Sequence, residues 1–228
     1  MMMRWLAACG IMAPVADILI TAGLGALDPG YSHGGQYISE LGEDGRPYAA
    51  AFNAWSVAYG LLFAGFAIGL SRDLGSRAVL AVLLAVAASS AAAGIFPCDP
   101  GCAGITPAAK IHFLAGYVAV PAIVLAPFLS GAAMSGRPAW RGYRAFSLAA
   151  GILLVVASGW LVAGYFAGRG QWWCPVGVAQ RVTLGIQYGW LVVLGGRLWV
   201  LAGRDSSAVV GTDGPGAEPV AAPDRGGM

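Results

Sequence analysis

Six long apolar stretches constrain the fold of this chain more than any other feature of its sequence. Each is 19 to 23 residues long, and together they cover residues 5–27, 51–70, 78–96, 111–133, 145–167 and 178–200. About 20 residues of α-helix cross the roughly 30 Å core of a bilayer. Backbone N–H and C=O groups cannot stay unpaired in lipid, so each stretch should be a helix. The sequence therefore predicts an all-α, multi-pass membrane protein built as a six-transmembrane-helix bundle.

The composition supports the lipid bilayer as the main partner and argues against nucleic acid. Hydrophobic residues make up 58% of the chain and charged residues only 11%, whereas soluble domains carry about 25% charged residues. The formal net charge of +2 is too small to attract a polyanion. The sequence has no glycine-rich phosphate loop and no cysteine pairs at zinc-ribbon spacing. It leaves the oligomeric state, any ligand and any cofactor open.

Basic residues predict the orientation of the bundle. With the N-terminus inside, eight Arg residues up to residue 204 fall on the inner segments and four Arg and Lys residues on the outer ones, so the positive-inside rule places both termini in the cytoplasm. Residues 1–203 form the predicted six-helix transmembrane domain. Residues 204–228 are rich in Gly, Pro and Ala without periodicity, which is typical of a disordered cytoplasmic tail.

The first outer loop, residues 31–42, carries the sequence YSHGGQYISELG. Its glycines permit tight turns, after which YISEL would fold back as a short helix at the interface. Glu40 is a candidate catalytic acid or base beside an apolar mouth, and Tyr37 and Ser39 are candidate ligand-binding residues. The alternative is a solvated loop with a capping Ser and a surface Glu.

The second outer loop, residues 96–102, reads FPCDPGC. Asp99-Pro100-Gly101 is typical of a turn. Cys98, Cys102 and Cys174 are candidates for a disulfide, since the outside of the membrane favours oxidation, and sequence does not choose among their pairings. Thiol redox chemistry and a metal site that recruits His112 or His33 are the alternatives.

Polar residues also begin the fourth and sixth stretches. His112 is a candidate proton carrier or metal ligand, or it bonds a loop carbonyl. Gln180, Thr183 and Gln187 share one helical stripe that should face the bundle. Arg181 is a candidate to hold an anionic group in a fork of hydrogen bonds, or it pairs with Glu40 or Asp99.

Asp17 lies in the middle of the first stretch. A charge at that depth costs about 2.5–3.5 kcal/mol on insertion scales. The carboxyl group should therefore be neutral, paired or next to a wet cavity. Two interpretations remain, a functional intramembrane carboxylate and a structural bond to a neighbouring helix.

Together these motifs resemble the domain-of-unknown-function 998 family of prokaryotic integral membrane proteins. The resemblance rests on YISELG after the first stretch, FPCDPGC after the third, His112 at the fourth and the Gln180-Arg181 pair at the sixth. It covers residues 5–200 and implies about six helices in a prokaryotic plasma membrane, with no known reaction. Family members often carry an acidic residue before the arginine, so Gln180 argues against proton transfer at that position.

Four residues are predicted to converge at the outer face: Glu40, Asp99, His112 and Arg181. The leading hypothesis is an outward-open pocket that binds a lipid or small amphiphile, with or without processing it. In it Arg181 holds an anionic group, Glu40 and His112 exchange protons, and Asp99 orients one of them. The alternatives are a structural membrane protein with a disulfide-locked outer cap, a small-solute transporter centred on Asp17, and a thiol–disulfide redox protein.

Overall fold

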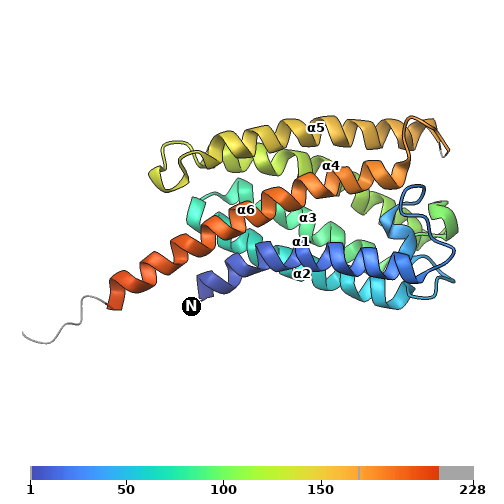
Figure 1. The fold of residues 1–228 in the computed structure, drawn as a ribbon, viewed down its shortest axis with the longest axis horizontal. Coiled ribbons are helices and arrows are strands. Elements are labelled where there is room, and N and C mark those ends of the chain that lie inside the picture. Colours follow the sequence, from blue (N-terminus) through green and yellow to red (C-terminus); the bar gives the residue numbers. More distant parts are fainter. Residues whose placement is uncertain (1, 169, 211–228) are drawn as a thin grey trace, which may run out of the picture.

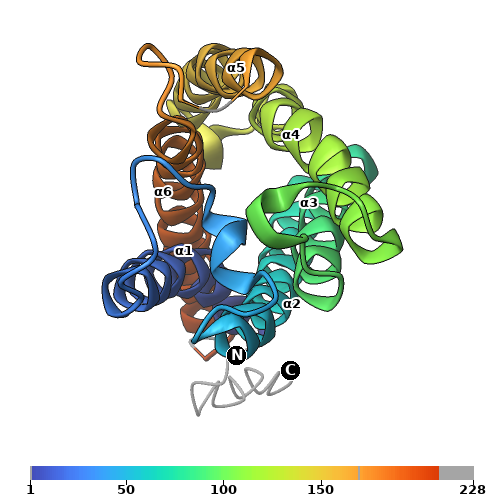
Figure 2. The same cartoon turned by 90° about the vertical axis from the view of Figure 1, so that its right-hand side faces the viewer.

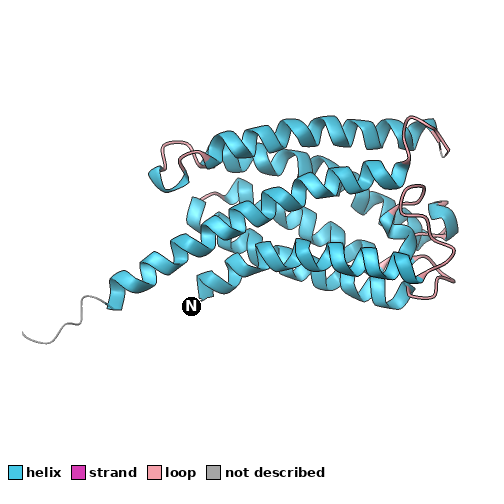
Figure 3. Cartoon of the chain, in the orientation of Figure 1, coloured by secondary structure: helices cyan, strands magenta, loops and turns pink. Residues whose placement is uncertain are grey.

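The structure is a computed structural model that describes residues 2–168 and 170–210, and in this part of the chain all regular secondary structure is helical. Three short 3-10 helices, η1 (Ile38–Gly42), η2 (Pro100–Cys102) and η3 (Pro138–Trp140), lie between long ones. The long helices are α1 (Met2–Leu27), α2 (Ala49–Leu74), α3 (Arg77–Ile95), α4 (Pro107–Ala133), α5 (Tyr143–Ala167) and α6 (Val176–Val210) (Figures 1 and 3). All six are long and apolar enough to cross a membrane, which confirms the six-helix prediction.

The predicted ends agree with the observed helices to within four residues, except at the end of α6. α4 begins at Pro107 because Thr106 caps it, accepting a hydrogen bond from the N–H of Ala109. His112 therefore lies in the second turn of α4 rather than at its start. α6 continues to Val210, past the predicted beginning of the tail at residue 204. The rest of the predicted tail, residues 211–228, lies outside the described residues.

The six long helices form a closed ring. Each packs against its neighbours in sequence, and α1 packs against α6 to complete the circle (Figure 2). The connections α2–α3, α4–α5 and α5–α6 are short, which makes these helices antiparallel neighbours. Small residues let helices approach: a Cβ on Gly10 of α1 would collide with the ring of Phe66 on α2.

The half of the ring that contains the N-terminus has a closely packed centre, and we call it the solid half. Its centre is filled by completely or almost completely buried side chains, among them Phe63, Phe66, Leu70, Trp190, Leu194 and Leu198. The indole N–H of Trp190 donates to the hydroxyl of Ser147 at 3.1 Å, which links α6 to α5.

Arg137 closes the end of this solid half. Its guanidinium donates to the carbonyls of Asp73 (3.1 Å) and Leu74 (2.8 Å) at the C-terminus of α2. Gly75 ends α2 in the left-handed conformation, with φ of 58°, which favours glycine. The indole of Trp140 donates to the carboxylate of Asp73 at 2.7 Å.

The opposite end of the ring is covered by residues 28–48 and 96–106, which we call the cap. Figure 2 shows η1 inside the ring, on the side formed by α1 and α2. Arg46 forms ion pairs with Asp28 (3.3 Å) and Glu43 (2.9 Å). Glu43 also accepts a hydrogen bond from the N–H of Gly101 at 2.7 Å, so one carboxylate joins the two segments of the cap.

Candidate functional site

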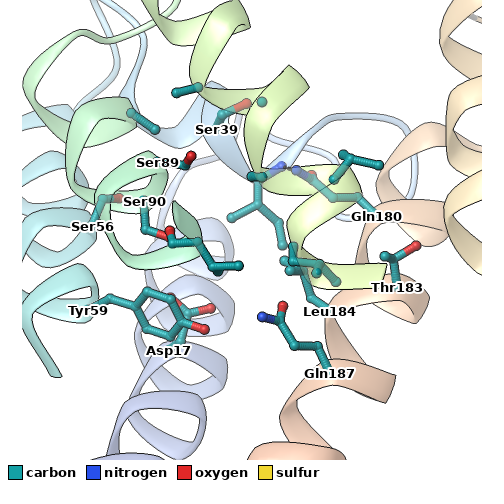
Figure 4. A pocket seen from close by; sticks show the side chains of 18 of the residues that line it. Asp17, Ser39, Ser56, Tyr59, Ser89, Ser90, Gln180, Thr183, Leu184 and Gln187 are labelled. Carbon is teal, nitrogen blue, oxygen red and sulfur yellow. Dashed lines mark hydrogen bonds between the residues drawn. The ribbon is translucent and has the colours of Figure 1, made fainter. Parts of the chain in front are cut away.

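Beneath the cap, the ring encloses a cavity of about 230 Å³, which we call the chamber. All six long helices and η1 contribute to its lining. Polar side chains face it at several levels (Figure 4). They include Asp17, Ser56, Tyr59, Ser89, Ser90, Gln180, Thr183, Gln187 and Tyr188.

A second cavity of about 470 Å³, the lateral groove, runs between α4 and α5. Its walls are mainly apolar and aromatic, and they include Phe113, Tyr117, Val120, Pro121, Leu161 and Phe166. Tyr117 and Phe166 are exposed on the surface of the ring. Their position on membrane-crossing helices gives the groove a side that faces lipid.

The chamber and the lateral groove share a wall. Ser39, His112, Gly116, Val120, Leu161 and Gln180 line both cavities. The two cavities are therefore adjacent, with the chamber in the centre of the ring, where polar side chains lie among apolar ones, and the lateral groove towards its side.

Asp17 of α1 lies in the chamber lining and holds three helices together. One carboxylate oxygen accepts from the indole N–H of Trp55 on α2 at 2.7 Å. The other accepts from the hydroxyl of Tyr188 on α6 at 2.5 Å. The structure thus shows the bond to neighbouring helices and places the carboxylate beside a cavity, while a functional role of Asp17 stays a prediction.

The stripe predicted on α6 faces the chamber. Gln180, Thr183 and Gln187 all line it, which confirms that the stripe points into the bundle. The side-chain oxygen of Gln180 accepts from the N–H of Ile38 at 2.6 Å and so anchors η1. Gln187 is only 3% exposed, and its side-chain oxygen has no hydrogen-bond partner.

His112 lies at the junction of the two cavities and lines both of them. Its Nδ1 lies 3.0 Å from the carbonyl oxygen of Phe96, just beyond the end of α3. A carbonyl oxygen only accepts, so Nδ1 carries the hydrogen and Nε2 of the neutral ring is an acceptor.

Glu40 is completely buried in the cap. Its carboxylate accepts from the N–H of Tyr37 at 2.8 Å and from the side chain of Gln36 at 2.9 Å. These bonds hold the first turn of η1. Tyr37 itself lines the groove, and Ser39 lines both cavities.

Arg181 fastens the cap to α6. Its guanidinium donates to the carbonyls of His33 (2.5 Å) and Gly177 (3.1 Å) and to the hydroxyl of Tyr31 (2.7 Å). Burial raises the pKa of Tyr31, so its hydroxyl keeps the hydrogen that it donates to the carbonyl of Tyr37 at 3.0 Å. Arg181 is not among the residues that line either cavity.

Asp99 organises the start of α4. Its carboxylate accepts from the hydroxyl of Thr106 (2.6 Å) and from the N–H groups of Thr106 (2.9 Å) and Ile105 (2.6 Å). These bonds, led by the Thr106 hydroxyl, lower the pKa of Asp99. Asp99 therefore orients a loop, whereas the sequence interpretation assigned it to a catalytic partner.

Cys98 and Cys102 form a disulfide, and Cys174 is a buried free thiol. The pairings that involved Cys174 are therefore wrong. Cys98 Sγ lies 3.7 Å from the carbonyl oxygen of Ser39, so the disulfide rests against η1.

The two histidines have different hydrogen-bonding partners. His33 Nδ1 lies 3.2 Å from the guanidinium of Arg181, whereas His112 contacts Phe96. Within residues 2–168 and 170–210, no three side chains of His, Cys, Asp or Glu cluster in a way that could hold a metal ion.

The residues that line the two cavities lie mostly below the cap, whereas the four predicted residues were expected to converge at the outer face. Of the four residues expected to converge, only His112 lines the two cavities, while Glu40, Asp99 and Arg181 have hydrogen bonds within or to the cap. Sequence reasoning missed several chamber residues: Ser56, Tyr59, Ser89, Ser90 and Tyr188. Their signal was weak but present, as isolated polar residues inside apolar stretches, with Ser56 and Tyr59 one helical turn apart.

Comparison with known proteins identifies a family. The family described as "Protein of unknown function (DUF998)" matches residues 11–197. No curated protein and no solved structure matches the chain. The matched segment begins within α1 and ends within α6, and it includes all the chamber-lining residues. The chain belongs to the DUF998 family.

Proposed function

We propose that this protein binds a single amphiphilic molecule, with its polar head in the chamber and its apolar chain in the lateral groove. The shared wall of the two cavities carries the proposal. A lipid or detergent-like molecule has a small polar part, which would meet the hydroxyls, amides and Asp17 of the chamber, and a longer apolar part, which would meet the walls of the groove. Binding sites for small molecules are commonly concave and apolar with a few converging polar groups, and this site fits that description.

The floor of the chamber supports binding over passage through the ring. Below Asp17 the centre is filled by aromatic side chains in contact. Tyr59 lies 5.9 Å from Phe63, Phe63 lies 6.4 Å from Phe66, and Phe66 lies 6.5 Å from Trp190, between ring centroids. A solute in the chamber would meet this aromatic stack, so we do not favour the transport hypothesis.

The proposed orientation places the cap outside a prokaryotic plasma membrane and both termini in the cytoplasm. Arg4, Arg72, Arg137 and Arg197 lie towards the end opposite the cap, and the positive-inside rule assigns that end to the cytoplasm. The groove then opens towards the outer leaflet, which would supply the amphiphile.

His112 is the candidate for any chemical step on the bound molecule. The head and chain of an amphiphile meet at the junction, where the His112 ring lies. Its Nε2 is an acceptor, so it is placed to act as a general base. Asp99 and Glu40 would act indirectly, by holding the cap over the site.

Gly116 offers a test of the proposed function. It lines both cavities, and a Cβ built on it meets nothing within 4 Å. The change Gly116→Leu should fill the junction without displacing a neighbour and so weaken binding. Gly159→Leu is the matched control, because Gly159 is also helical with nothing within 4 Å and lines neither cavity.

The measurement is binding of dodecylamine, dodecanol and dodecanoate to the purified protein in nanodiscs, followed by native mass spectrometry. The proposal expects saturable binding of at least one probe to the wild type and to Gly159→Leu, and weaker binding to Gly116→Leu. Absence of saturable binding of all three, or equal binding to both variants, would contradict it.

A second candidate function is structural, with the cap as a stapled cover. The observation in its favour is the Cys98–Cys102 disulfide against η1. It expects Cys98→Ser with Cys102→Ser to reduce stability by about 2 kcal/mol, the loop-entropy estimate for so short a loop, without a change in bound amphiphile. Loss of amphiphile from this double variant at full helix content would instead make the cap part of the binding site.

A further inference from the structure

We propose that the head group that enters the chamber is a protonated amine, held by the carboxylate of Asp17 and the side-chain oxygen of Gln187. The inference rests on the proposed function and adds to it the chemical class of the ligand. The inference depends on hydrogen-bond acceptors in the chamber that have no positively charged partner among the described residues.

Asp17 is the first of these groups. It is 9% exposed and lies midway along α1. Its two oxygens accept from donors that belong to Trp55 and Tyr188. Each oxygen has further lone pairs with which to accept. Among the described residues, no Arg, Lys or His forms an ion pair with Asp17.

Gln187 is the second group. Its side-chain oxygen is buried without a hydrogen-bond partner, although buried polar atoms are almost always paired. Figure 4 shows Gln187 across the chamber from Asp17 and Tyr59. An acceptor in this position lacks a donor, and a ligand in the chamber would supply one.

The remaining lining fits a cation better than an anion. No Lys or Arg is among the residues that line the chamber, so a phosphate or carboxylate would meet Asp17 without a compensating charge. The lining includes the rings of Tyr59, Tyr188 and Phe52, and aromatic faces attract ammonium groups.

An ammonium group satisfies these requirements together. It carries three N–H donors and no acceptor, whereas an alcohol brings one donor and no charge. This conclusion replaces the anionic head group that the sequence suggested. That suggestion depended on Arg181, whose guanidinium holds the cap.

The test compares dodecylamine with dodecanol in the binding assay described above. Wild-type protein should prefer the amine. Asp17→Asn keeps the shape of the side chain and an acceptor oxygen while it removes the charge. We expect it to weaken amine binding by more than about tenfold, the scale set by loss of one partner of a buried charge pair, with dodecanol binding little changed.

Gln187→Leu provides a second variant in case Asp17→Asn does not fold. It should also weaken the amine, since the unpaired acceptor is lost. Ser130→Ala is the matched control: the Ser130 hydroxyl is likewise buried and unpartnered, but Ser130 lines neither cavity. Butylamine as competitor tells the sources apart, because efficient competition would indicate a free small amine and weak competition an amphiphile.

The outcomes separate the two proposals. If dodecanol binds as well as dodecylamine, and Asp17→Asn and Gln187→Leu leave the amine unaffected, the amine inference is overturned while amphiphile binding stands. If none of the probes binds, the proposed function fails first.

Discussion

At the residue scale, Asp17 shows how one side chain both holds the fold and creates a site. The carboxylate lies within a membrane-crossing helix, where an unpaired charge is costly. Trp55 and Tyr188 supply two donors from two other helices. The same bonds fix the carboxylate in the lining of the chamber.

Tyr188→Phe tests this bond. It removes the donor to one carboxylate oxygen and should lower the free energy of unfolding by about 0.5–2 kcal/mol. Tyr117→Phe is the control, because the Tyr117 hydroxyl contacts that of Tyr165 at 3.3 Å on the exposed surface, and it should change stability much less. Reversible unfolding in mixed micelles measures both. Equal losses of unfolding free energy in the two variants would show that the hydrogen bond from Tyr188 to Asp17 stabilises the protein no more than the surface contact of Tyr117.

Asp99 predicts an acid-sensitive cap. Hydrogen bonds from Thr106 and Ile105 lower its pKa below the ordinary 3.8, so its ionised form is favoured in the folded protein. The resulting stability is fully present above the ordinary pKa and is lost as the pH falls through the lowered one. Melting curves from pH 6 down to about pH 2 should therefore show a steeper acid loss for the wild type than for Asp99→Asn. If acid lowers the stability of the wild type and of Asp99→Asn equally, Asp99 is not responsible for the acid sensitivity of the cap.

At the element scale, the cap is positioned mainly by α6. Arg181 binds carbonyls of the loop that precedes η1, and Gln180 binds the N–H of Ile38 at the start of η1. Gly177, one turn before Arg181, makes the close approach possible. A Cβ there would lie 2.5 Å from the carbonyl oxygen of His33 and 2.8 Å from that of Gly34.

Gly177→Ala should therefore push the cap away from α6 and lower the melting temperature. Gly185→Ala on the same helix meets nothing within 4 Å and should be neutral or stabilising by up to about 1 kcal/mol through helix propensity. Hydrogen exchange at residues 31–42 reports the displacement directly. Unchanged protection in Gly177→Ala would refute tight docking of the cap.

At the scale of the whole molecule, the ring has a solid half and a hollow half. The solid half is packed with aromatic and aliphatic side chains, and the hollow half under the cap is lined by hydroxyls, amides and Asp17. Close packing stabilises the solid half, whereas a cavity in the hollow half lowers the free energy of unfolding.

Phe66→Ala should cost about 3–5 kcal/mol, as is usual for a large core side chain, because Phe66 is completely buried. Phe166→Ala is the control in the groove, where the side chain is 77% exposed. It should leave the free energy of unfolding almost unchanged and weaken amphiphile binding. Similar losses of stability in both variants would contradict the division of the ring into two halves.

The sequence by itself determined the six helices, their approximate ends and the inward stripe on α6. Helix length and periodicity are local properties, since a membrane requires about 20 apolar residues whatever the neighbours are. Local reasoning also identified the residues of the cap, although it assigned them to a ligand.

Only the tertiary structure decided which polar residues meet. Asp17 and Tyr188 are 171 positions apart, and Arg181 is 148 positions from His33. The order of helices around the ring brings these residues together, and apolar periodicity does not encode that order. The closing of α1 against α6 therefore brings Asp17 beside Tyr188 in the lining of the chamber, whereas Glu40, Asp99 and Arg181 have their hydrogen bonds within or to the cap.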